Sequence, residues 1–248
     1  MITVDRVSHR FGDVEVLDCV DLNVADGGFV SLVGPSGCGK STLLRILAGL
    51  LRPSSGDARI GNESVVGRPG PAAYMPQRDL LLPWRRALAN ATVGAEIAGV
   101  PRPQAERQAA ELFGRFGLAG FERAWPAELS GGMRQRLALL RTFLCGRAVL
   151  LLDEPFGALD AITRRDMHGW LQEVLQADRR TVLLVTHDVE EALVLSDEVI
   201  VLSDRPGRVV ERMPVDLPRP RTLEALSSDT FVAAKSKLLR ALEAGRAV

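Results

Sequence analysis

The chain has 248 residues, 46% of them hydrophobic, so it is long enough for one large domain or two closely joined ones around a buried core. Lysine plus arginine and aspartate plus glutamate number 31 each. This balance excludes a global positive field that would attract nucleic acid or anionic lipid. The longest strongly apolar stretches, such as 148–152 and 181–185, are far below the roughly 18 residues of a membrane-spanning helix, so we expect none.

The N-terminus and the cysteines favour a cytoplasmic protein. Residues 1–6 lack a charged segment followed by an apolar run, so we expect no secretion signal. The three cysteines are odd in number and have no CxxC spacing. Neither a disulfide framework nor a zinc site is indicated, which fits a reducing compartment.

The first third of the chain predicts antiparallel strands and then a strand, a loop and a helix. Apolar and polar residues alternate up to about residue 30 with glycine-rich breaks between them, which is typical of short antiparallel strands. Residues 29–33 form an apolar run that ends in a glycine-rich turn. Residues 41–51 then carry leucines at helical spacing, and Pro53 ends the pattern.

The second half of the chain predicts a helical insertion followed by buried strands. Residues 86–146 are rich in Ala, Leu, Glu, Gln and Arg, with Gly and Pro at the breaks, and indicate a helical subdomain inserted in the sheet domain. Buried strands are then predicted at 149–152, 182–185 and 199–202, separated by helices. This alternation favours a largely parallel sheet.

The tail of the chain predicts a linker and one helix. Residues 214–220 contain three prolines and are typical of a linker. No internal repeat or low-complexity tract is present. The final helix has one apolar stripe, formed by Phe231, Ala234, Leu238 and Leu242.

A complete GxxxxGK[ST] loop lies between a predicted strand and a predicted helix, the context that this phosphate-binding motif requires. Glycines let the backbone approach a polyphosphate closely, and amides at a helix N-terminus point at its oxygens. Lys40 supplies a point charge to the β- and γ-phosphates, and the Ser41 hydroxyl can ligate Mg²⁺. These surroundings should favour the thiolate of Cys38, with a buried, inert cysteine as the alternative. The loop consists of Gly34, Pro35, Ser36, Gly37, Cys38, Gly39, Lys40, Ser41 and Thr42.

Two adjacent carboxylates end the predicted strand at 149–152. Side chains alternate along a strand, so Asp153 and Glu154 should face different ways and have different roles. Asp153 suits the Mg²⁺ sphere, as a Walker B aspartate does, and Glu154 suits a base that polarises the attacking water. Plain solvated loop residues are the alternative, which the nearby phosphate loop disfavours.

The segment 129–136, LSGGMRQR, provides a second anion site. Ser130 should cap a helix that runs from about Met133, with the amides of Gly131 and Gly132 at its positive end. The stretch resembles the LSGGQ signature of ATP-binding cassette (ABC) proteins, with Met133 in place of Gln, and lies just upstream of the Walker B strand as in that family. The resemblance covers roughly residues 1–220.

Four further residues match positions of the ABC family. Phe11 resembles the aromatic residue that stacks on adenine, usually Tyr in the family, and a core Phe is the competing interpretation. Gln77 matches the Q-loop glutamine that senses Mg²⁺ and the attacking water. Asp160 resembles the D-loop aspartate at a dimer interface, although Gly157 replaces the commoner Ser. His187 matches the switch histidine that contacts the γ-phosphate.

The resemblance implies an α/β phosphate-loop ABC ATPase fold with a mainly parallel core sheet, an N-terminal antiparallel β subdomain and an inserted helical subdomain. We expect one nucleotide-binding domain over 1–248. Its cofactors would be ATP and Mg²⁺, and two cassettes would pair head to tail so that each signature closes the other's ATP. The expected parts are an ATP-binding core (1–85 and 147–213), a helical signature subdomain (86–146) and a C-terminal tail (214–248).

The chain resembles importer motors more than other cassettes. Residues 186–193 resemble the THDxxEAL string of importers, and Leu82-Pro83-Trp84 with Asn90 resembles the nitrate, sulfonate and taurine branch. That resemblance implies transmembrane permease subunits as partners, an indirect substrate-binding protein, no nucleic acid, and a peripheral place on the cytoplasmic face of the inner membrane. Residues of this chain do not name the cargo.

Two other function classes remain open. A nucleotide or small-molecule kinase would share the phosphate loop but would not need the signature at Leu129. A non-catalytic nucleotide-binding module would require the loss of the base or the lysine, and both Glu154 and Lys40 are present.

Overall fold

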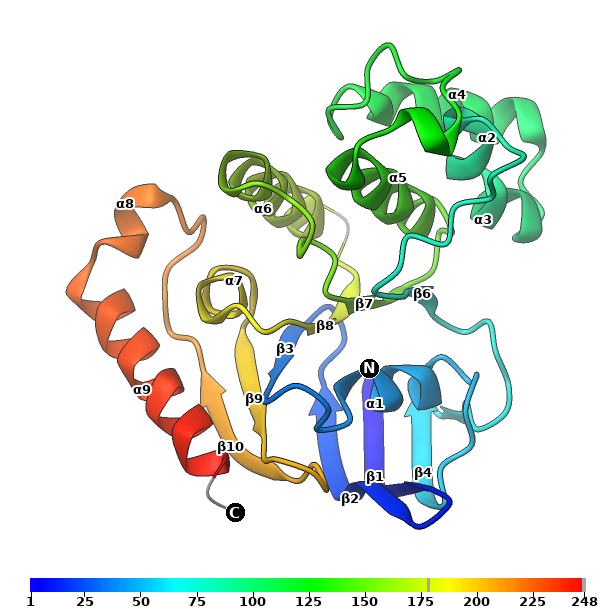
Figure 1. The fold of residues 1–248 in the computed structure, drawn as a ribbon. Helices are drawn as coiled ribbons and strands as arrows, with labels where there is room; N and C mark the ends of the chain where they lie inside the picture. The colour runs from blue at the N-terminus through cyan, green and yellow to red at the C-terminus, as the bar shows by residue number, and fades with distance from the viewer. Residues whose placement is uncertain (178, 247–248) are drawn as a thin grey trace.

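The computed structural model describes residues 1–177 and 179–246, which form two sheets with helices around them (Figure 1). The N-terminal sheet has the strand order β2-β1-β4-β5, and all its pairs are antiparallel, as the alternating pattern predicts. Its first two strands, at 10 and 11 residues, are longer than the short strands expected there. The strands are β1 (Ile2–Phe11), β2 (Val14–Val24), β4 (Ser55–Ile60) and β5 (Glu63–Ser64).

The larger sheet has the order β10-β9-β3-β8-β7-β6. β3 pairs in parallel with β8 and β9, and β7 pairs in parallel with β6 and β8. Only β10, at the edge, is antiparallel to its neighbour among the described strands, so the predicted mainly parallel sheet is confirmed. Its strands are β3 (Phe29–Val33), β6 (Ala73–Met75), β7 (Val149–Asp153), β8 (Thr181–Val185), β9 (Glu198–Leu202) and β10 (Val209–Pro214).

The larger sheet separates two hydrophobic cores because its side chains alternate between two faces. Leu151 and Leu183 join the core shared with the N-terminal sheet and α1. Their neighbours Leu152 and Leu184 join the core shared with the later helices. Burial on both faces explains why β3, β7 and β8 are apolar runs in the sequence.

The helix after the phosphate loop, α1 (Lys40–Leu47), ends earlier than the predicted 41–51. Gly49 takes a left-handed conformation with φ of 74°, and a Cβ there would lie 2.5 Å from the backbone of Arg68. The leucine spacing continues past this point, but the chain turns because only glycine fits both the conformation and the space.

Residues between β6 and β7 form a group of helices that lies apart from the N-terminal sheet (Figure 1). Alanines and phenylalanines on their inner faces, such as Ala91 and Phe113, are buried against α5 and the larger sheet. None of the helices in the described parts of the chain combines the length and the hydropathy that a bilayer span needs. The elements are α2 (Ala87–Ala91), α3 (Val93–Ile97), α4 (Arg102–Phe113), η1 (Pro126–Glu128) and α5 (Gly131–Phe143).

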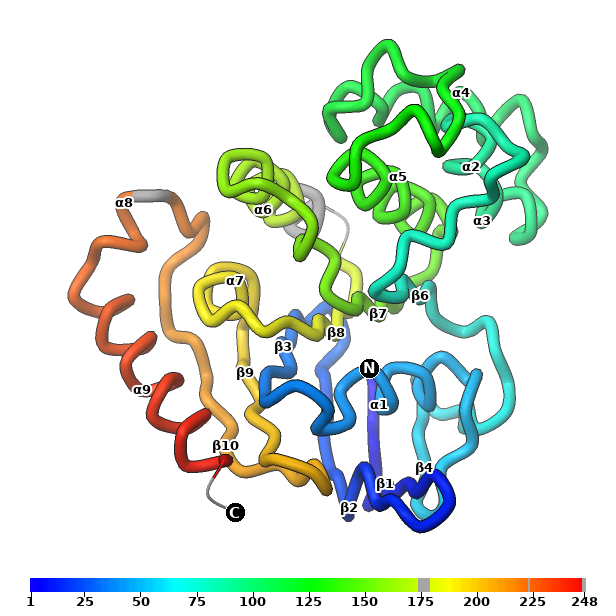
Figure 2. The backbone as a smooth tube through the Cα atoms, viewed as in Figure 1, coloured from blue at the N-terminus to red at the C-terminus, as the bar shows by residue number. Residues whose placement is uncertain are grey.

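After the helical group the chain forms the remaining strands of the larger sheet. The C-terminal helix then packs beside the edge of that sheet formed by β9 and β10 (Figure 2). α9 (Asp229–Gly245) contacts α7 (Val189–Leu195), β9 and β10. The predicted apolar stripe of this helix is confirmed, since Phe231 and Leu238 are buried and Ala234 and Leu242 are partly buried against the core. The remaining helices are α6 (Ala161–Ala177) and α8 (Leu223–Leu226).

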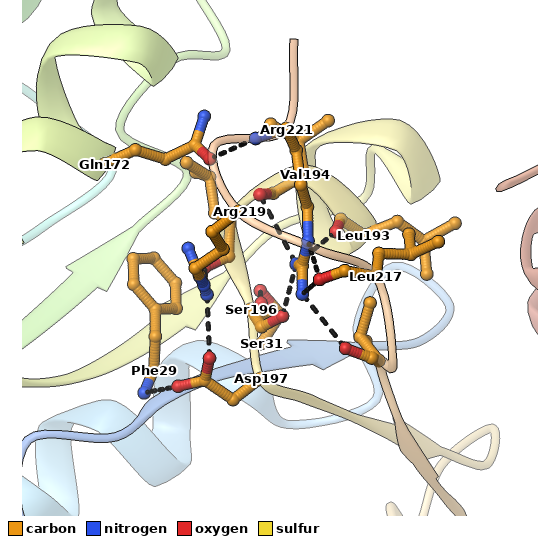
Figure 3. Close-up of polar contacts among 12 residues, drawn as sticks. Phe29, Ser31, Gln172, Leu193, Val194, Ser196, Asp197, Leu217, Arg219 and Arg221 are labelled. Carbon is orange, nitrogen blue, oxygen red and sulfur yellow. Dashed lines mark hydrogen bonds and ion pairs between the residues drawn. The ribbon is translucent and has the colours of Figure 1, made fainter. Parts of the chain in front are cut away.

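The segment that links β10 to α8 is fixed by one buried arginine (Figure 3). The Arg221 guanidinium donates to the carbonyls of Leu193 and Ser196 at the end of α7, at 2.6 and 2.5 Å, and to Val215 in its own segment at 3.0 Å. Its backbone N–H donates to the Gln172 side chain of α6. Burial lowers the pKa of Arg221 to about 10, so it remains a cation at neutral pH. The predicted linker is therefore a tether between α6, α7 and the sheet edge.

Candidate functional site

The predicted phosphate loop spans the turn between β3 and α1. Its glycines at 37 and 39 have φ of 81° and 104°, and a Cβ at Gly39 would lie 2.5 Å from the Leu17 side chain. The first turn of α1 contains no acidic residue of its own, which leaves the positive end of the helix dipole suited to an anion. The buried Lys40 ammonium donates to the carbonyls of Gly34 and Pro35, both at 2.7 Å. A glycine-rich turn with one lysine at a helix N-terminus is an arrangement that suits a polyphosphate.

The Cys38 thiol does not behave as expected from its neighbours. It is only 1% exposed, and burial raises its pKa although Lys40 Nζ, 3.6 Å away, partly opposes the shift. The expectation of a favoured thiolate is therefore wrong. Desolvation of the charged form outweighs the nearby cation and the helix terminus.

Ser41 and Asp153, which lie far apart in the sequence, meet at the end of the larger sheet. The Ser41 hydroxyl donates to Asp153 Oδ1 at 3.1 Å. Asp153 is 2% exposed; burial raises its pKa, and the Ser41 hydrogen bond partly opposes that rise. A hydroxyl and a carboxylate are hard oxygen donors that suit Mg²⁺. The described residues contain no cluster of three His, Cys, Asp or Glu side chains for a metal.

Glu154 faces a different set of groups from Asp153, as expected, but it lies just beyond the end of β7, so a left-handed turn and not strand alternation sets its direction. Its Oε2 accepts from Gln77 Nε2 at 3.0 Å, and its Oε1 lies 3.2 Å from His187 Nδ1. Its backbone has φ of 49°, and its N–H donates to the carbonyl of Val185 on the adjacent strand. Two sequence-predicted residues from different loops, Gln77 and His187, therefore meet at the carboxylate of a third, Glu154.

The signature segment forms the start of α5. Ser130 accepts from the N–H of Met133 at 3.2 Å, so the predicted cap is confirmed, and the helix begins at Gly131, two residues earlier than expected. α5 belongs to the group of helices apart from α1 (Figure 1). No hydrogen bond or ion pair among the described residues joins Ser130, Gly131 or Gly132 to the phosphate loop.

Phe11 and Asp160 lie at the ends of elements. Phe11 ends β1, is 49% exposed, and makes an edge contact with His9 with ring centroids 4.5 Å apart, so it is not a core residue. Asp160 accepts from the N–H groups of Ile162 and Thr163 at the start of α6. Hydrogen bonds from Thr163 lower the pKa of Asp160. Within this chain the carboxylate thus caps a helix.

Two residues that the sequence did not single out also reach the site. Gln135 Nε2 donates to the carbonyl of Glu154 at 3.3 Å, which joins the signature helix to the strand end. Arg164 contacts both Leu159 and Asp188. Spacing offered a signal for Arg164, which lies one turn after Asp160, but not for Gln135, which lies five residues after Ser130 and on a different face of the helix.

Comparisons with known proteins identify relatives over nearly the whole chain. A family model described as ABC transporter matches residues 17–157. An aliphatic sulfonates import ATP-binding protein of Rhodococcus jostii is 54% identical over 217 residues, 87% of this chain and 84% of that protein. Another of that description from Rhodopseudomonas palustris is 45% identical over 246 residues, 98% of this chain and 84% of that protein. A solved dimeric ATP-binding cassette in a post-hydrolysis state with ADP and Pi has a TM-score of 0.78 at 28% identity, covering 87% of this chain and 99% of that chain.

Proposed function

Because the chain belongs to the ABC transporter family and hydrolyses ATP, we propose that it is the motor subunit of a bacterial importer for aliphatic sulfonates or a related oxyanion nutrient. The observation that carries the motor role is the convergence of Gln77 and His187 on the Glu154 carboxylate. The sulfonate assignment rests on the two relatives that are named for sulfonate import.

The residues divide the chemistry between them. Lys40 and the loop amides bind the phosphates, and Ser41 with Asp153 would hold Mg²⁺, which supplies charge neutralisation at the phosphates. Glu154 orients the attacking water and takes up its proton. Gln77 holds the Glu154 carboxylate in place for this step. His187 binds the γ-phosphate. Phe11, exposed at a strand end, stacks on adenine.

We assign the second half of the ATP site to another copy of the chain. The signature amides and Asp160 do not reach this chain's own phosphate loop through any described polar contact, which supports a homodimer with each signature on the partner's ATP. The solved relative of similar fold is itself dimeric. ATP would close the dimer and hydrolysis would reopen it.

A groove beside Gln77 is the proposed dock for the membrane permease. It has a volume of about 530 Å³ and lies between α1, β6 and the helical group. Leu50 and Leu80 on its wall are 60% and 58% exposed, and Trp84 nearby is 71% exposed. Exposed apolar side chains that gather around one groove are typical of protein contact sites. The cassette would thus lie on the cytoplasmic face of the inner membrane and meet the substrate-binding protein only through the permease.

Growth on defined sulfur sources tests the cargo. A strain that lacks this gene should fail to grow on ethanesulfonate as sole sulfur source and should grow normally on sulfate. The wild-type gene should restore growth, and a Lys40→Ala gene should not. Normal growth of the deletion strain on ethanesulfonate, together with failure on taurine sulfur or nitrate nitrogen, would move the assignment to that other substrate.

A further inference from the structure

Arg164 joins two loops that each carry a predicted site residue. It lies in the first turn of α6, directly after the loop with Asp160. Its Nη2 donates to the carbonyl of Leu159 at 3.0 Å, and its Nη1 donates to Asp188 Oδ2 at 3.2 Å. One planar guanidinium therefore contacts the loop before α6 and the turn before α7.

Asp188 uses its other oxygen to hold the start of α7. Its Oδ1 accepts from the N–H groups of Glu190 and Glu191 at 2.9 and 3.1 Å, and its own N–H donates to Thr186 Oγ1 at 3.0 Å. These bonds fix the turn on both sides of His187, whose ring reaches Glu154. The Arg164 contact thus acts on a turn that is already tight, and its displacement would move the imidazole.

Two carboxylates near Arg164 favour a cation there. A narrow crevice behind the site is lined by Arg164, His187, the carboxylates of Glu154 and Asp188, and the carboxyl group of Glu191, whose pKa burial raises to about 8. The Arg164 and Asp188 side chains are 30% and 31% exposed, so the pair is partly shielded from water. A lysine would keep the charge, but it would lack the rigid fork of donors that reaches a carbonyl and a carboxylate together.

We propose that Arg164 is a positioning residue for ATP hydrolysis, which holds the turn of His187 in fixed relation to the loop of Asp160. The contacts above support this role within one chain. A second consequence depends on the proposed dimer. Asp160 would lie at the dimer interface, so closure of the two cassettes would change the position of His187 through the Arg164 guanidinium. The contact between His187 and the γ-phosphate would then depend on whether the dimer interface is open or closed.

Steady-state kinetics of four variants test this role. Arg164→Met removes all donors, Arg164→Lys keeps the charge, and Asp188→Asn keeps an oxygen that can cap α7 but removes its charge. Arg165→Met, at the exposed neighbouring arginine, is the matched control. We expect Arg164→Met to lower kcat about tenfold with KM for ATP within about threefold of wild type. Arg164→Lys should recover only part of kcat, and Arg165→Met should match wild type.

A double-mutant cycle separates positioning from general stability. If Arg164 acts through Asp188, the variant with Arg164→Met and Asp188→Asn should have nearly the kcat of the slower single variant. Thermal unfolding midpoints within a few degrees of wild type would accompany this result. Multiplicative losses in the double variant, or wild-type kcat in Arg164→Met, would overturn the proposal. ATP turnover is measured without any transported substrate, so a wrong sulfonate assignment does not affect the outcome. If Arg164→Met does not fold, Asp188→Asn and Arg164→Lys decide the question alone.

Discussion

Glu154 has a left-handed backbone conformation, and its side chain has two specific partners. A left-handed conformation in a residue that is not glycine costs on the order of 1 kcal/mol or more and persists only where the surroundings hold it. Here the holding contacts are the backbone bond to Val185 and the side-chain partners Gln77 and His187. The turn carries the carboxylate away from Asp153, so that the two adjacent acidic side chains have separate partners, Ser41 for Asp153 and Gln77 with His187 for Glu154.

The Glu154→Gln variant should bind ATP and turn it over about 10²-fold more slowly or worse, because an amide cannot accept the proton of the attacking water. ATPase activity of the complex with its membrane subunits measures this. A Glu63→Gln variant, at an exposed strand residue remote from the site, is the control and should match wild type. Near-normal turnover in Glu154→Gln would show that another group is the base.

At the scale of elements, α6 and α7 bury two titratable side chains against each other. His168 Nε2 and Glu191 Oε2 lie 3.9 Å apart, beyond hydrogen-bond distance. Burial lowers the pKa of His168 to about 4 and raises the pKa of Glu191 to about 8. Both are therefore mostly neutral at pH 7, and the two helices pack without a buried ion pair.

This contact predicts a stability profile with a defined sign. Glu191 binds more protons in the folded state between pH 4.5 and 8, so its contribution to stability falls as pH rises through that range. His168 binds fewer protons in the folded state between pH 4 and 6.5, so its contribution rises with pH there. Between about pH 4.5 and 6.5 the contributions of Glu191 and His168 to stability change in opposite directions. From pH 6.5 to 8 only the loss of stability from Glu191 remains.

Denaturant unfolding of Glu191→Gln at several pH values checks the profile. The amide does not titrate, so the variant should lose less stability than wild type between pH 6.5 and 8. Glu190→Gln, at the exposed neighbouring position, should keep the wild-type slope. Parallel curves for wild type and Glu191→Gln over this range would contradict the assigned pKa.

Helices and strands could be predicted from the sequence where a local residue pattern sets their position. They could not be predicted where a contact with a distant part of the chain sets it. Apolar runs and alternation correctly located β3, β7, β8 and β9, because both faces of the sheet are buried. The end of α1 was missed because the backbone near Arg68 determines it. The same limit applies to the site. Its phosphate loop follows from spacing, whereas the raised pKa of Cys38 and the contacts of Arg164 depend on residues that only folding brings together.

At the scale of the whole molecule, the proposed dimer predicts complementation between defective subunits. A Ser130→Arg subunit damages the partner's ATP site, and a Lys40→Ala subunit damages the site on its own loop. A mixed dimer then has one site with both defects and one with neither, while each homodimer has two damaged sites. ATPase activity should be low for each mutant alone and partly restored in a defined mixed complex with the membrane subunits.

Two controls make this experiment decisive. Homodimers of each mutant subunit, prepared in the same way, should show no restored ATPase activity. The intact site of the mixed dimer should bind one ATP. If that site binds ATP but the mixed dimer does not close upon nucleotide addition, the head-to-tail arrangement is wrong.

The Arg221 tether joins the tail to the helix that follows His187. α7 has only seven residues, and a guanidinium holds each of its ends: Arg164 through Asp188 at the start, and Arg221 on the last carbonyls. The contacts at its two ends couple α7 to α6 on one side and to the tail on the other, so that the turn of His187 is held from both directions. A cassette trimmed before Arg221 would keep the phosphate loop, the signature and His187 but would lose the guanidinium that holds the last carbonyls of α7.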